Sequence, residues 1–170
     1  MAWPSPGSAI FTAAALNPLL QHVNPGSLTS PTGYSDLVAT DVVKCALYGN
    51  SGTPDKDAAV ANTGYNTGAW VTGNEISGAG YTAAGSALAS KTFASASGAV
   101  NFGAANVSWT SATISNAYGD LVYDDSISAG TVAKQGLAMH YFGGAASVTS
   151  GTFTIAWSSG YVFRFTFAYA

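Results

Sequence analysis

The side chains best suited to acid–base, nucleophilic or metal chemistry are few in this 170-residue chain, and they lie far apart. There are two histidines, His22 and His140, and one cysteine, Cys45. Zinc sites combine three or four Cys, His or carboxylate ligands, typically at short and regular spacings. Neither histidine has such a neighbour, and Cys45 sits in an apolar run where a buried thiol is expected. We therefore expect no zinc centre, no disulfide framework and no reactive thiol.

Five of the eight carboxylates fall into two small groups, and the only glutamate stands alone. The groups are Asp55 with Asp57, and Asp120 with Asp124 and Asp125. Such groups can hold calcium, but the Asp-x-Asp-x-Asp-Gly loop is absent, and turn formation accounts for them better. The isolated carboxylate is Glu75, which has no identifiable second carboxylate for glycoside hydrolysis. No Gly-x-Ser-x-Gly elbow or phosphate-binding loop is present either, so we expect neither an enzyme nor a cofactor.

Aromatic side chains offer another kind of chemistry, which is stacking on sugar rings. Trp70 and Tyr81 lie on predicted loops or strand ends, as do Tyr65 and Trp109. An exposed ring in such a segment can carry a glycan, so Trp70 and Tyr81 are the candidate platform. Packing in the core or in an interface is the alternative for all four residues.

The elements that position these residues are predicted to be β-strands, and the clearest spans residues 161–169. Alternate positions are aromatic over nine residues, a period of two that no helix accommodates. The aromatic residues are Tyr161, Phe163, Phe165, Phe167 and Tyr169. Such a face must be covered, either by the core or by a neighbouring subunit. Because Ser158-Ser159-Gly160 is a tight connection, residues 152–157 and 161–167 are predicted to form a hairpin.

Shorter strands are predicted along the rest of the chain from residue 36. Segments 42–48 and 86–93 are the first two, and Gly, Asn and Asp separate those that follow. The later segments are 99–102, 107–109, 113–115, 118–123, 135–142 and 148–157. Eight or nine short strands predict an all-β fold over residues 36–170, a two-layer antiparallel sandwich of jelly-roll or Greek-key type.

Residues 1–35 are predicted to form an extended N-terminal arm. Five of the six prolines fall there, and proline at that density disfavours sheet pairing. The arm also carries apolar side chains that need cover, either on their own domain or on another molecule. These are Ile10, Phe11, Leu16, Leu19 and Leu20. We expect them to be the residues through which the arm contacts a partner.

Charged residues are scarce, at 8% of the chain, against about 25% in an ordinary domain. The five Lys and Arg residues form no cluster that would neutralise phosphates, so we expect no nucleic-acid partner. The apolar stretch at residues 9–20 is interrupted by Asn17-Pro18 and no basic region precedes it, so neither a signal peptide nor a membrane partner is expected. A neutral surface suits a protein that packs against copies of itself or against a large partner.

Several short motifs occur in a suggestive order. Residues 44–48 read Lys-Cys-Ala-Leu-Tyr, residues 74–85 read Asn-Glu-Ile-Ser-Gly-Ala-Gly-Tyr-Thr-Ala-Ala-Gly, and residues 121–124 read Leu-Val-Tyr-Asp. In this order they resemble a group of small structural proteins of tailed bacteriophages, over residues 43–154. Ala84 stands where that group usually has a glycine. We expect Gly78, Gly80 and Gly85 to allow positive φ and close backbone approach around Tyr81.

The resemblance implies a virion component and carries no catalytic residues. Within it we expect a capsid decoration (cement) protein, a homotrimer that binds the major capsid protein on the outside of the head. Such a protein is assembled in the cytoplasm of the bacterial host and ends up in the virion. A tail or fibre component and a carbohydrate-binding sandwich module are the alternatives.

Overall fold

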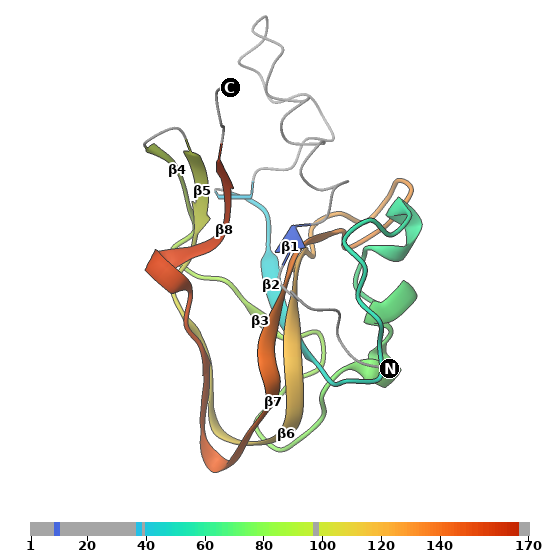
Figure 1. Cartoon of the computed structure of the whole chain (residues 1–170), viewed down its shortest axis with the longest axis vertical. Coiled ribbons are helices and arrows are strands. Elements are labelled where there is room, and N and C mark those ends of the chain that lie inside the picture. Colours follow the sequence, from blue (N-terminus) through green and yellow to red (C-terminus); the bar gives the residue numbers. More distant parts are fainter. Residues whose placement is uncertain (1–8, 11–36, 39, 97–98, 167–170) are drawn as a thin grey trace, which may run out of the picture.

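The computed structural model describes residues 9–10, 37–38, 40–96 and 99–166 (Figure 1). Within these ranges, eight strands form two antiparallel sheets, and the only helical elements are short 3-10 turns. The predicted fold class, an all-β two-layer antiparallel sandwich, is confirmed.

The larger sheet has the strand order β1-β7-β6-β2-β3. Its centre is the long antiparallel pair β6 (Val107–Asp124) and β7 (Gly136–Ile155). The apolar strand β2 (Val43–Tyr48) pairs with the last third of β6, and every residue in it except Lys44 is buried. The short strands β1 (Ala9–Ile10) and β3 (Ser86–Ala87) form the two edges.

The smaller sheet has the order β4-β5-β8, formed by Thr92–Ala96, Ala99–Gly103 and Tyr161–Thr166. The predicted hairpin between residues 152–157 and 161–167 is wrong, because β8 pairs with β5 and not with β7. A 3-10 turn, η4 (Ser158–Gly160), separates the two segments, and Ser159 within it has a φ of 56°. The connection is tight, as predicted, but it turns the chain out of the larger sheet and into the smaller one.

The long strands β6 and β7 bend instead of running straight. Figure 1 shows both strands turning at the bottom of the view and running up towards β5 and β8. Their register shifts repeatedly between Trp109 and Gly119, which is the mark of β-bulges. Ser111, Asn116 and Ser150 take left-handed backbone conformations in this region. The separate predicted strands at 107–109, 113–115 and 118–123 are therefore one bent strand.

The predicted strand at residues 86–93 is, conversely, two strands in different sheets. Ser86–Ala87 pairs with β2, while Thr92–Ala96 pairs with β5. Ser90, between them, has a φ of 51°. A left-handed residue breaks the extended run, so the chain leaves one layer and enters the other.

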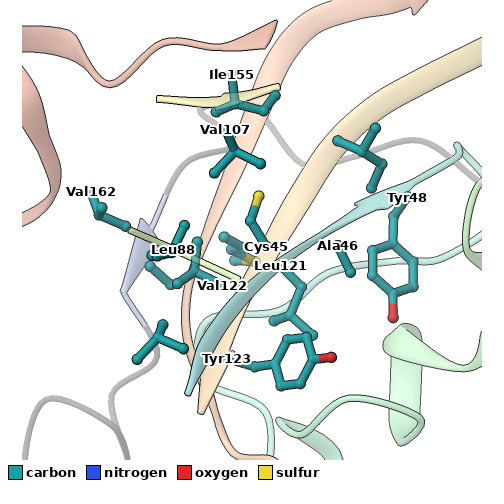
Figure 2. Close-up of a cluster of buried hydrophobic side chains, with 14 of the residues drawn as sticks. Cys45, Ala46, Tyr48, Leu88, Val107, Leu121, Val122, Tyr123, Ile155 and Val162 are labelled. Carbon is teal, nitrogen blue, oxygen red and sulfur yellow. The ribbon is translucent and has the colours of Figure 1, made fainter. Parts of the chain in front are cut away.

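The core lies where the larger sheet meets the strands that cross over it (Figure 2). Cys45 and Leu121 are fully buried there, and Figure 2 shows Val107 and Ile155 above Cys45 and Val162 to its left. The buried free thiol predicted at Cys45 is confirmed. Val162 belongs to the non-aromatic face of β8, so that strand buries side chains on both faces.

The aromatic alternation in β8 is only partly buried. Phe163 is 9% exposed and Phe165 packs partly buried against the core, but Tyr161 is 37% exposed. Phe167 and Tyr169 lie outside the described residues.

The start of the chain contributes to the larger sheet, which differs from the expected unpaired arm. Ala9 and Ile10 pair with Met139 and Ala138 of β7. Neither residue is a proline, and an edge strand needs donors on one side only, so the neighbouring prolines do not prevent this pairing. The other predicted arm contacts, Phe11, Leu16, Leu19 and Leu20, lie outside the described residues.

The segment between β2 and β3 packs beside the larger sheet and contains three 3-10 turns. These are η1 (Val60–Asn62), η2 (Gly68–Trp70) and η3 (Thr72–Asn74), drawn in green at the right of Figure 1. No helix in the described ranges is long and apolar enough to cross a membrane.

Candidate functional site

Glu75, the only glutamate of the chain, is the centre of a hydrogen-bonded cluster. The Tyr65 hydroxyl donates to its Oε2 at 2.7 Å, and the Tyr81 hydroxyl donates to its Oε1 at 2.7 Å. The backbone N–H of Ala84 donates to Oε1 at 2.8 Å. Three donors thus converge on one carboxylate. Two of them, from Tyr81 and Ala84, fix Glu75 to the glycine-rich segment that follows it.

The hydroxyl groups of Tyr81 and Tyr123 join this cluster to the strands β2 and β6. The Tyr81 hydroxyl accepts the backbone N–H of Leu47 in β2 at 2.9 Å. The Tyr123 hydroxyl of β6 donates to the Ala84 carbonyl at 2.8 Å, and its ring stacks on that of Tyr65 with centroids 4.9 Å apart. The cluster therefore fastens residues 75–85 onto β2 and β6.

The phenol groups of this cluster are donors and not nucleophiles. Burial raises the pKa of Tyr65, Tyr81 and Tyr123, and of the neighbouring Tyr48, well above the usual range. The nearby carboxylates, chiefly Glu75 and, for Tyr123, Asp125, raise these pKa values further. The hydroxyls stay protonated at physiological pH and provide no phenolate base.

The glycines of this segment have the roles predicted for them. Gly85 has a φ of +68°, and a Cβ added there would lie 1.9 Å from the carbonyl oxygen of Cys45. A Cβ at Gly78 would lie 2.0 Å from the carbonyl oxygen of Thr113, and Gly80 has a φ of +75°. Positive φ or close backbone approach is thus confirmed at all three positions around Tyr81.

The predicted glycan platform is wrong at Trp70, because that ring is buried. Trp70 is 1% exposed and packs edge-on against Tyr48, with ring centroids 5.1 Å apart. The Tyr81 ring lies against Trp109, and its hydroxyl is fully engaged in the Glu75 cluster. Tyr65 and Trp109 are also buried. Trp70, Tyr65 and Trp109 therefore offer no exposed ring to a sugar, whereas Tyr81 is only partly buried.

The predicted groups of aspartates do not converge on one point. Asp125 forms ion pairs with Lys44 at 2.7 Å and Lys134 at 3.1 Å, whereas Asp120 faces His140. Burial opposes ionisation of Asp125, but the two lysines outweigh it and lower the pKa of that carboxyl. Asp55 accepts the backbone N–H of Asp57 at 2.9 Å, which is a turn-forming contact. In the described part of the chain, no three His, Cys, Asp or Glu residues are grouped to hold a metal ion.

A contact that the sequence does not indicate joins Asp120 to His140. Asp120 on β6 lies opposite His140 on β7, and Nδ1 of the imidazole is 2.6 Å from Oδ1 of the carboxylate. Nε2 is 2.8 Å from the carbonyl oxygen of Val162 on β8. The two residues are far apart in sequence, and only the register of the β6–β7 hairpin brings them together.

An open surface hollow of about 580 Å³ lies beside the Glu75 segment. Its lining is mostly polar and includes Asn74, Ser115, Asn116 and Tyr118. Glu75 also lines the hollow, but its carboxylate is already hydrogen-bonded to three donors of the chain. The amide and hydroxyl groups beside one aromatic ring therefore suit a neutral, polyhydroxylated molecule better than a charged one. If any described surface takes a sugar, this hollow has more suitable chemistry than Trp70.

No protein-family model matches the chain, and neither a curated protein nor a solved structure is significantly similar to it. The interactions of its own residues are therefore the basis for assigning a role. The Glu75 and Asp125 clusters join segments of the fold to each other and leave no activated nucleophile.

Proposed function

We propose that this protein is a structural component of a tailed-phage particle, and that it acts as a decoration protein on the outer lattice of the head. The motif order over residues 43–154 supports a phage structural role. The scarcity of charged residues supports the same role, because a largely uncharged surface suits lasting contact with other proteins.

The observation that carries the proposal is an exposed aromatic side chain on the smaller sheet. Phe93 on β4 is 48% exposed, although it lies beside the fully buried Phe102 with ring centroids 6.1 Å apart. Phe102 in turn stacks on Phe163 at 5.0 Å, so one aromatic row runs from the core to the surface. Tyr161, two residues from Phe163, is exposed on the same sheet.

The position of Phe93 favours contact with another protein. β4 is an edge strand, and in the described residues its outer side pairs with no other strand. An exposed edge with a large apolar side chain is costly in water and is a typical site of protein association. A few aromatic side chains that enter pockets on the partner commonly contribute most of the binding energy of an interface. We assign Phe93 to capsid contact, with the buried Phe102 and Phe163 supporting its ring from within, and call these three residues the aromatic row below.

Electron cryomicroscopy of the phage particle tests the location. Density for this fold at the threefold or quasi-threefold positions of the outer head lattice is the expected result. Density at the tail would replace the decoration role with a tail role. Absence from the particle would contradict both, and a glycan array probing the polar hollow would then be the next measurement.

A pair of variants tests the contact itself. Phe93→Ser should weaken binding to capsids at least tenfold, because the aromatic anchor is lost. Its unfolding midpoint should change little, since half of the side chain is already in water. Val71→Ser, at an apolar residue 37% exposed between η2 and η3, is the matched control and should bind normally. Equal binding by both variants would remove the aromatic row from the interface.

A further inference from the structure

One imidazole connects the two sheets of the sandwich. His140 lies on β7 and is hydrogen-bonded to Asp120 of the same sheet and to the Val162 carbonyl of the other sheet. The Trp157 ring lies against the imidazole, with centroids 5.5 Å apart. The side chain of His140 is 24% exposed, whereas Asp120 is completely buried.

The chemistry of the two partners determines how many protons this connection needs. The Val162 carbonyl oxygen only accepts hydrogen bonds, so Nε2 must carry a hydrogen. An ionised Asp120 also only accepts, so Nδ1 must carry a second hydrogen. If Asp120 supplies the proton instead, the total is the same. The connection therefore holds one proton more than a neutral imidazole beside an ionised carboxylate.

We propose that His140, Asp120 and the Val162 carbonyl form a proton-dependent clasp that holds the smaller sheet against the larger one. Loss of the proton leaves one N–H for two acceptors, so one of the two hydrogen bonds is lost. It also removes the counter-charge of Asp120, whose buried Oδ2 has no nitrogen or oxygen donor among the described residues. The clasp is independent of the proposed capsid role, because it concerns how the sandwich itself is held together.

The other titratable and charged groups near the clasp do not replace the imidazole. From β2, the Cys45 thiol lies beside Asp120; burial, and then this carboxylate, raise its pKa well above the usual value. From β8, Arg164 follows Val162 by two residues and is exposed to solvent. The thiol stays protonated near neutral pH and is a weak donor. His140 is thus the group in the clasp that changes charge there.

The direction of the pH effect follows from the surroundings of the imidazole. Burial alone would lower the pKa of His140, but the charge of Asp120 and the two hydrogen bonds outweigh it and raise the pKa above the ordinary 6.5. A raised folded-state pKa means that protonation stabilises the fold. This stabilisation is complete below pH 6.5 and is lost as the pH rises through the folded-state pKa.

Nuclear magnetic resonance of the imidazole nitrogens in the full chain tests the protonation directly. His22→Gln removes the only other histidine and leaves one set of signals to assign. We expect His140 to titrate with a pKa above 6.5 and to carry hydrogens on both nitrogens below that pKa. A pKa at or below 6.5 would overturn the proposal, whatever the stability of any variant.

Thermal unfolding as a function of pH tests the consequence. Between pH 6 and pH 9.5 the midpoint of the wild-type chain should fall by about 4 °C as the clasp loses its proton. His22→Gln should show the same fall, whereas His140→Gln, which cannot gain a charge, should show a flat profile. An equal slope in His140→Gln would overturn the proposal. If that variant does not fold, the titration of His140 decides the matter.

Discussion

Ala84 is held in an unfavourable backbone conformation by its neighbours. Its φ is 72°, its N–H donates to Glu75 and its carbonyl accepts the Tyr123 hydroxyl. A residue with a Cβ costs about 1–2 kcal/mol in the left-handed region. The hydrogen-bond cluster around Glu75, and not local preference, therefore sets this conformation.

Replacing Ala84 with glycine should relieve that strain. We expect Ala84→Gly to raise the free energy of unfolding by about 0.5–1 kcal/mol, because glycine adopts this φ without penalty but loses more entropy on folding. Urea denaturation measures the change. Ala83→Gly, at an exposed neighbour without positive φ, is the control and should not stabilise the chain. A gain of the same size at both positions would contradict the strain explanation.

Single residues were predictable where their local sequence determines their environment. The apolar run around Cys45 indicated a buried thiol, and the glycine spacing around Tyr81 indicated tight backbone contacts. Trp70 was misplaced because its turn-rich context is typical of exposed residues, whereas Tyr48, distant in sequence, covers it. The same limit hid the contact of His140 with Asp120, which depends on strand register.

At the scale of an element, the sequence pattern did not indicate how long the strands β6 and β7 are. Ser, Asn and Gly residues along β6 and β7 read as turns between short strands. In the structure they form bulges within two continuous strands, because a left-handed residue can bend a strand without ending it. The pattern of residues 161–166 did predict a strand, but alternation defines the faces of a strand and not its partner.

The bend of β6 provides a prediction at this scale. Ser111 has a φ of 51°, a conformation that is especially unfavourable for a β-branched residue. Ser111→Val should lower the free energy of unfolding by about 1–3 kcal/mol. Ser115→Val, at an exposed position of the same strand without positive φ, should change it by less than about 0.5 kcal/mol. Equal effects in urea denaturation would show that the bend does not depend on Ser111.

The neutral surface of the whole molecule has a consequence for its proposed association with the capsid. The chain has five basic and eight acidic residues, and salt screens only contacts between charges. Binding through the aromatic row should therefore change less than about threefold in affinity between 0.1 and 1 M sodium chloride. Sedimentation of capsids with labelled protein measures this. A steep loss of binding in salt would indicate that charged residues, and not the aromatic row, form the interface.

The bent β6–β7 hairpin also sets an order of events during folding. Its two strands are joined by the short segment 125–135, so their pairing closes a small loop at low entropic cost. β2 must find β6, and β5 must find β8, across much longer stretches of chain. Local pairings form faster than distant ones, so the hairpin is expected to form first and serve as the template for both sheets. During synthesis on the ribosome, β2 emerges well before β6 and β7. Its apolar residues therefore stay without their native partner strand until β6 has been synthesised.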